Sequence, residues 1–200
     1  PKEVAVIGGG YVGLVTSALL AKLGHTVRVV EMDAQKVKGL KSRKTRVPIY
    51  EPGLREMIVQ AKKDKQISFT TDFKKAIRAS SIVYLAVGTP QQDTGEVDLS
   101  YILGAAGQVG DVIRETGQFK TIVIKSTVTP DTFEKIEDLL KRKGLRVGEH
   151  YALVSNPEFL KEGEAIINVT EPDRSVFGFS AKMPPAVRKM AVQTMLELLY

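Results

Sequence analysis

The feature that most constrains the fold is a glycine-rich turn near the start of the chain. An apolar run with β-branched residues, residues 4–7, ends at Gly8, and a helix-like pattern begins about three residues later. Gly8, Gly10 and Gly13 have the spacing G-x-G-x-x-G between a predicted strand and a predicted helix. The first glycine permits a tight turn, the second lets a pyrophosphate approach the backbone, and the third lets the helix pack on the sheet. The helix N-terminus then offers free N–H groups to a phosphate.

A second predicted strand, residues 26–30, supports this interpretation. It ends on Glu31, an acid about 20 residues after the motif, where dinucleotide-binding folds place a ribose-binding carboxylate. Because a carboxylate accepts hydrogen bonds from both ribose hydroxyls and repels a 2′-phosphate, the expected cofactor is NAD rather than NADP. Asp33 is a second acid nearby, which we expect to cap the next helix. A purely structural strand–turn–helix unit remains the alternative.

Strands and helices alternate along the rest of the chain. This order predicts an α/β fold, a Rossmann-like doubly wound and mostly parallel sheet with helices on both faces. The turn chemistry predicts that Asp72 caps one helix and that Pro130 occupies the first turn of another, which runs to about Lys143. Further strands are expected at residues 67–70, 81–87, 121–124, 151–154 and 175–179.

Three loops at predicted strand ends should meet at one edge of the sheet: residues 88–90, 125–127 and 156–158. Glu158 and Glu162 are four residues apart, so on a helix they would share a face and could act on a hydroxyl or a water. An ordinary solvated glutamate pair explains the same spacing. The Thr127 hydroxyl could likewise position water or cofactor, or only cap the following helix.

Composition excludes several other classes of site. The 200 residues include no cysteine, which removes disulfides and thiol chemistry from this chain and is compatible with a cytoplasmic location. His25 and His150 each lie near a turn, so we expect both on the surface, and no metal-ligand spacing is present. The net charge of +6 includes a basic stretch at residues 36–46 without interleaved aromatics. We interpret that stretch as a solvated helix end and loop rather than a binding patch, and we expect neither a nucleic-acid nor a membrane partner.

Six stretches resemble the UDP-glucose dehydrogenase family, in the order in which the family carries them. The resemblance covers nearly the whole chain, and its last two motifs are specific. The six stretches are residues 8–14, 48–54, 87–90, 125–130, 156–163 and 172–174. The resemblance implies an enzyme that oxidises the C6 alcohol of UDP-glucose to the carboxylate of UDP-glucuronate. The reaction would use two NAD and pass through aldehyde and enzyme-bound thioester stages. The resemblance also implies a homodimer or a larger homo-oligomer for the full-length protein.

By motif position, the resemblance assigns roles to individual residues. Thr127, Glu158 and Glu162 would be catalytic, with Glu158 activating or orienting the water that hydrolyses the thioester. The sugar nucleotide would contact Glu158, Phe159, Leu160 and Lys161. The cofactor would contact Gly8, Gly10, Tyr11, Val12, Gly13, Glu31, Lys36, Gly88, Thr89, Pro90, Ser126, Thr127 and Glu162.

Departures from the family pattern limit what this chain could do alone. Family members carry a nucleophilic cysteine on a second nucleotide-binding domain, and no cysteine is present here. We therefore expect residues 1–182 to be an NAD-binding domain and residues 183–200 to begin the helix that leads to the second domain. Asp131 and Asn168 stand where the family usually has glycine and aspartate. GDP-mannose dehydrogenase, or a non-catalytic NAD-binding module, are the alternative functions.

Overall fold

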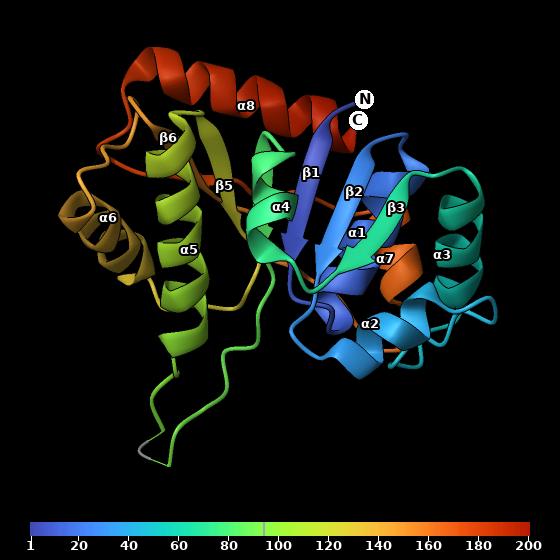
Figure 1. The fold of residues 1–200 in the computed structure, drawn as a ribbon. Helices are drawn as coiled ribbons and strands as arrows, with labels where there is room; N and C mark the ends of the chain where they lie inside the picture. Colours follow the sequence, from blue (N-terminus) through green and yellow to red (C-terminus); the bar gives the residue numbers. More distant parts are fainter. Residues whose placement is uncertain (94) are drawn as a thin grey trace.

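The fold is built on one seven-stranded sheet, seen in a computed structural model that describes residues 1–93 and 95–200 (Figure 1). The strand order is β3-β2-β1-β4-β5-β6-β7, and every neighbouring pair is parallel except β6 and β7. The strands are β1 (Glu3–Ile7), β2 (Thr26–Val30), β3 (Ile67–Thr70), β4 (Ile82–Leu85), β5 (Lys120–Ile124), β6 (Tyr151–Ser155) and β7 (Gly178–Phe179). The predicted doubly wound α/β class is confirmed.

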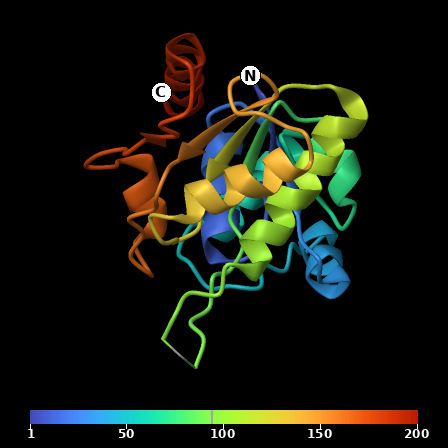
Figure 2. The same ribbon diagram turned by 90° about the vertical axis from the view of Figure 1, so that its left-hand side faces the viewer.

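Helices cover both faces of this sheet because its strands are apolar on both sides. One core layer lies between the sheet and α1, α2, α3 and α8, and the other lies between the sheet and α4, α5 and α6. Figure 1 shows α4 and α5 in front of the sheet, and Figure 2 shows α5 and α6 side by side on that face. The helices are α1 (Tyr11–Lys22), α2 (Ala34–Lys41), α3 (Leu54–Lys63), α4 (Phe73–Arg78), α5 (Ser100–Thr116), α6 (Thr132–Arg142), α7 (Ala165–Thr170) and α8 (Pro185–Leu199).

The order of the strands reverses between β1 and β4. From β1 the chain proceeds outward to β2 and β3, then returns to place β4 on the other side of β1. The loops after β1 and β4 therefore diverge and leave a crevice at the carboxyl ends of the strands, which is where such sheets bind ligands. The glycine turn follows β1, and residues 88–90 follow β4, so two of the predicted loops flank this crevice.

Several predicted boundaries need correction. Helix α6 begins at Thr132, and Pro130 lies in the preceding turn, where the Thr132 N–H donates to the Thr129 carbonyl at 3.0 Å. The strand expected at 175–179 shortens to the two residues of β7, which pair antiparallel with β6. Helix α7 was not predicted, because six residues are too few to show a helical period.

His25 is buried, which contradicts the predicted surface position. Its exposed fraction is 5%, its Nδ1 accepts from the Lys2 backbone N–H at 3.1 Å, and its Nε2 lies 3.0 Å from the Leu198 carbonyl. Helix α8 ends beside the start of the chain (Figure 1), and the Lys2 ammonium lies 2.7 Å from the Glu197 carboxylate. Contacts with the last turn of α8 therefore cover the histidine.

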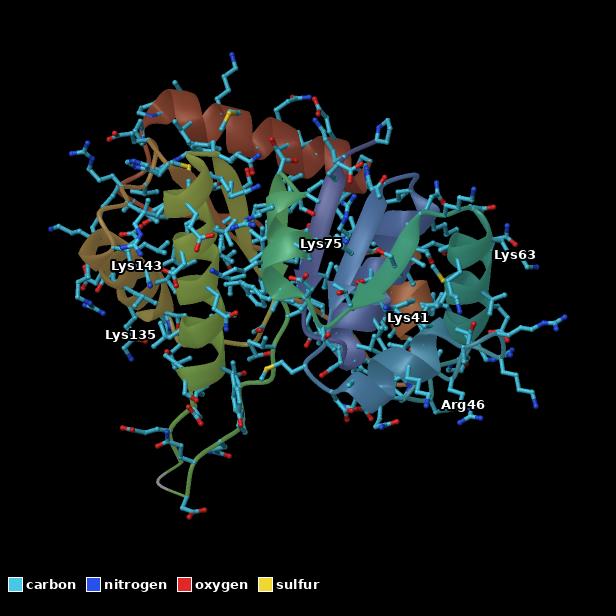
Figure 3. All side chains as sticks on the ribbon, in the orientation of Figure 1. Lys41, Arg46, Lys63, Lys75, Lys135 and Lys143 are labelled. Atoms are coloured by element: carbon cyan, nitrogen blue, oxygen red, sulfur yellow. The ribbon has the colours of Figure 1, made fainter. Side chains whose placement is uncertain are left out.

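The positive charge is spread over several helices. The basic residues of the 36–46 stretch are all exposed. Figure 3 shows Lys41 and Arg46 on one side of the molecule and Lys135 and Lys143 on α6 and its end at the other. Within residues 1–93 and 95–200, no helix is long and apolar enough to cross a bilayer.

Candidate cofactor groove and carboxylate loop

The glycine turn has the close backbone approaches that its spacing predicts. A Cβ on Gly8 would lie 2.3 Å from the Ala86 carbonyl oxygen, and the φ of Gly8 is +114°, a value that side-chain-bearing residues rarely adopt. A Cβ on Gly13 would lie 1.9 Å from the Gly8 carbonyl oxygen, so α1 contacts the turn directly. Gly10 differs because a Cβ there would meet nothing within 4 Å. Gly8 and Gly13 therefore serve packing, and Gly10 leaves open space above the helix N-terminus.

A groove of about 980 Å³ opens over this turn, and we call it the cofactor groove. Glu31 lies on its wall, with Oε2 accepting from the Gly9 N–H at 3.2 Å and Oε1 accepting from the Asp33 N–H at 3.0 Å. These two bonds fix the carboxylate and leave lone pairs for further donors. Lys36 lines the same groove. The Asp33 side chain caps α2 through the Gln35 and Lys36 N–H groups, as predicted.

The loops after β4 and β5 form the opposite side of the site. Gly88, Thr89 and Pro90 line the cofactor groove, and the Thr89 hydroxyl donates to the Thr127 carbonyl at 2.7 Å. Thr127 itself is exposed, and its side chain is available to a ligand. The Ser126 hydroxyl is buried and donates to the Val87 carbonyl at 2.7 Å, so this side chain joins the two loops.

Residues 156–163, which we call the carboxylate loop, follow β6. They are not helical, so the predicted shared helix face of Glu158 and Glu162 is wrong. The Glu158 Oε2 accepts from the Leu160 N–H at 2.5 Å, a local bond that competes with helix formation. Glu162 is exposed, and its charge is close enough to Tyr11 to help raise the pKa of that phenol.

The side chains assigned to the sugar nucleotide lie in different settings. Glu158, Phe159 and Leu160 line a cavity of about 170 Å³ between α1, the carboxylate loop and the end of α8. The exposed Phe159 ring lies 5.4 Å from the Arg174 guanidinium carbon. Lys161 is exposed and pairs with Glu164 at 2.9 Å, and its N–H donates to the Asn168 side chain. Asn168 therefore supplies the acceptor that an aspartate could also supply.

Lys125 also lines this cavity, although no role was predicted for it. Its Nζ lies 3.3 Å from the Asn156 Oδ1, and the Asn156 amide is oriented by a bond to the Val176 carbonyl. Burial lowers the pKa of Lys125 to about 8, while the Glu158 carboxylate partly opposes that shift. The only sequence signal was a lysine at a strand end, which is too common to single out.

Glu51 is the second residue that the sequence did not assign. Its carboxylate is 6% exposed and accepts from the Tyr11 hydroxyl at 2.5 Å, the Gly163 N–H at 2.8 Å and the Ala165 N–H at 2.9 Å. Glu51 therefore joins the start of α1, just after the glycine turn, to the end of the carboxylate loop. The prolines near it in the sequence, Pro48 and Pro52, indicate a stiff segment and give no indication of these partners.

The cofactor groove fits a dinucleotide. It combines an open space at Gly10, the N-terminus of the 12-residue helix α1 and a fixed carboxylate at the end of β2. Two threonine-bearing loops and the carboxylate loop bring polar groups to the same edge of the sheet. No group of three or more metal-ligating side chains occurs among the residues that the structure describes.

Comparison with known proteins identifies the same kind of domain. A family model described as the NAD-binding domain of the UDP-glucose/GDP-mannose dehydrogenase family matches residues 2–195. UDP-glucose 6-dehydrogenase TuaD of Bacillus subtilis is 40% identical over 186 residues, which are 93% of this chain and 39% of that protein.

Two solved structures are also similar. The GDP-mannose dehydrogenase of Pseudomonas aeruginosa, in a ternary complex, has a TM-score of 0.89 at 32% identity, covering 98% of this chain and 43% of that one. The UDP-glucose dehydrogenase of Pyrobaculum islandicum has a TM-score of 0.87 at 34% identity, with the same coverage of 98% and 43%. The chain thus spans about two fifths of the length of these relatives.

Proposed function

Because the chain belongs to the UDP-glucose/GDP-mannose dehydrogenase family, we propose that it is the cofactor half of an enzyme that oxidises UDP-glucose to UDP-glucuronate. The family's domain binds NAD, and the groove fits that cofactor. The observation that carries the proposal is the arrangement of the cofactor groove and the carboxylate loop at one sheet edge. A module that only bound NAD would need no carboxylate loop there.

The proposed cofactor contacts combine residues that line the groove with residues that the family resemblance assigns. Gly10 and the N–H groups of Tyr11 and Val12 would hold the pyrophosphate, and Glu31 would accept the ribose hydroxyls, with Lys36 beside it. Gly88, Thr89 and Pro90, which line the groove, would lie at the nicotinamide half, where the resemblance also assigns Ser126, Thr127 and Glu162. When bound, NAD would accept the hydride that leaves the C6 carbon of the sugar.

The protein groups around the reacting carbon would manage water and protons. We propose that Glu158 orients or activates the water consumed in the second half of the reaction, and that Thr127 helps to hold it. Phe159, Leu160 and Lys161 would hold the sugar nucleotide. The thiol needed for a covalent intermediate is not among these 200 residues, so another part of the full-length protein would supply it.

The alternative substrate is GDP-mannose, the substrate named for one of the similar structures. We propose UDP-glucose because the stretch from Glu171 to Arg174 resembles that of UDP-glucose dehydrogenases. Arg174 lines the cavity beside the carboxylate loop. We also propose a homodimer or a larger homo-oligomer for the full-length protein, with residues 183–200 beginning the connection to its second domain.

Three measurements test the proposal. Calorimetric titration of this chain should show NAD binding that is stronger than NADP binding, and absence of NAD binding would contradict the proposal. The full-length protein should form NADH faster from UDP-glucose than from GDP-mannose, and the reverse ratio would support the alternative substrate. Steady NADH formation by the 200-residue chain alone would refute the requirement for an external thiol.

A further inference from the structure

Glu51 links two parts of the site that lie more than 100 residues apart in the sequence. On one side, its carboxylate binds the hydroxyl of Tyr11, the residue directly after Gly10. On the other side, it binds the N–H of Gly163, the residue directly after Glu162. A third bond, from the Ala165 N–H, holds the first turn of α7. One buried carboxylate therefore connects the glycine turn to the carboxylate loop.

The chemistry of this cluster makes the link persistent. Burial by itself would raise the pKa of Glu51, but the donors from Tyr11, Gly163 and Ala165 outweigh it, so the pKa is lowered. The Tyr11 pKa rises to about 12, through burial and its bond to Glu51. At neutral pH, Glu51 is thus a charged acceptor and Tyr11 a neutral donor, and charge-assisted bonds of this kind are strong.

We propose that Glu51 is a positioning residue that holds Glu162 and Gly163 in register with the glycine turn, so that the nicotinamide half of NAD meets a preformed loop. The proposal rests on the proposed function, which places Glu162 on the nicotinamide side. Gly163 has a φ of +86°, which glycine adopts readily and most other residues do not, so this glycine permits the turn whose N–H donates to Glu51. Without the anchor, the loop would lose a fixed relation to the cofactor.

The test compares two ligands that share their adenosine and pyrophosphate parts. NAD carries the nicotinamide group and ADP-ribose does not, so the ratio of their dissociation constants isolates the nicotinamide half. Glu51 Oε2 accepts from the Tyr11 hydroxyl and the Gly163 N–H, and Oε1 accepts from the Ala165 N–H. In Glu51→Gln, the NH₂ that replaces either oxygen cannot accept from the N–H that faces it. We expect the NAD dissociation constant to rise about tenfold, the equivalent of one hydrogen bond, and that of ADP-ribose to rise less than about threefold.

Glu137→Gln is the matched control. Glu137 is also 6% exposed and is held by Ser180 and Lys182, but it lies on α6 and lines neither the cofactor groove nor the cavity beside the carboxylate loop. It should leave the ratio of the two constants unchanged even if it lowers the melting temperature. Amide spectra of Glu51→Gln without ligand should show shifts at Glu162 and Gly163 and none in α5.

The outcomes separate the positioning role from the proposed function. If the wild type binds no NAD, the proposed function fails and the positioning role fails with it. If NAD binds but Glu51→Gln weakens NAD and ADP-ribose equally, Glu51 is only structural and the positioning role alone is refuted. The same holds if neither affinity changes. If Glu51→Gln does not fold, Tyr11→Phe removes one of the three bonds and should raise the NAD constant selectively by a smaller factor.

Discussion

The glycine turn allows the packing role and the binding role of glycine to be separated within one motif. In Gly13→Ala, the new Cβ would lie 1.9 Å from the Gly8 carbonyl oxygen. Because close C···O contacts in proteins are about 3.3 Å, α1 would have to retreat by roughly 1.4 Å. In Gly10→Ala, the new Cβ meets nothing within 4 Å, and the φ of −86° at this position suits any residue.

The magnitudes of the two effects should therefore differ. Overpacking costs about 1–3 kcal/mol, and a Cβ held 1.9 Å from a backbone oxygen belongs to the upper end of that range, about 2–3 kcal/mol. The helix propensity of alanine offsets about 1 kcal/mol of that cost for Gly13→Ala. A net loss of about 1–2 kcal/mol corresponds to a melting temperature about 2–8 °C lower for a chain of this size. Gly10→Ala should melt within about 2 °C of the wild type, since a substitution that touches nothing changes stability little.

Cofactor binding should show the opposite dependence. The Cβ of Gly10→Ala projects into the space through which a pyrophosphate would approach, so we expect the NAD dissociation constant to rise at least about tenfold. Thermal melts monitored by circular dichroism give the melting temperatures, and calorimetric titrations give the NAD dissociation constants. The reasoning is refuted if Gly13→Ala melts like the wild type, or if Gly10→Ala binds NAD with unchanged affinity.

Three further predictions concern other parts of the chain. The buried Lys120 ammonium donates to the Ile77 and Ser80 carbonyls and to a glutamine side chain. Lys120→Met should therefore lower the free energy of unfolding by about 2–4 kcal/mol in urea titrations, and a loss below about 0.5 kcal/mol would contradict this. Burial lowers the pKa of His25, so the unfolded chain binds the proton more readily and stability falls as the pH decreases below about 6.5. His25→Gln should flatten that acid-side slope, which is at most about 1.4 kcal/mol per pH unit, and an unchanged slope would assign it to other groups. Glu31→Ala should weaken NAD binding about tenfold and reduce the preference for NAD over NADP, as measured by titrations with both cofactors. An unchanged preference would exclude Glu31 from the ribose site.

Much of the fold could be predicted because its determinants are local. The spacing of the three glycines, the Asp33 and Asp72 caps and the apolar strands can each be recognised from residues within a few positions of one another. The alternation of strands and helices then leaves few topologies, and the parallel order places the loop ends at one edge. The positions of Glu31 and Thr89 at the cofactor groove follow from that order.

The missed features depend on partners that are distant in the sequence. His25 is buried by contacts with Lys2 and with Leu198 at the far end of the chain. Glu51 acquires its role from Gly163 and Ala165, 112 and 114 residues away. No local pattern distinguishes such a carboxylate from a solvated one, because the nearby prolines, Pro48 and Pro52, indicate only that the segment is stiff.

The Glu158 and Glu162 pair shows where a spacing argument ends. Four-residue spacing places two side chains on one face only if the backbone between them is helical. Here residues 156–161 have no regular structure and residues 162–164 form a turn, and the Leu160 N–H donates to the Glu158 side chain, where a helix would use a backbone carbonyl. The two carboxylates are therefore positioned separately: Glu158 faces the cavity with Lys125, and Glu162 lies toward Tyr11. Separate positions would allow Glu158 to act on the water and Glu162 to contact the cofactor. Two carboxylates on one helix face would instead point to the same place.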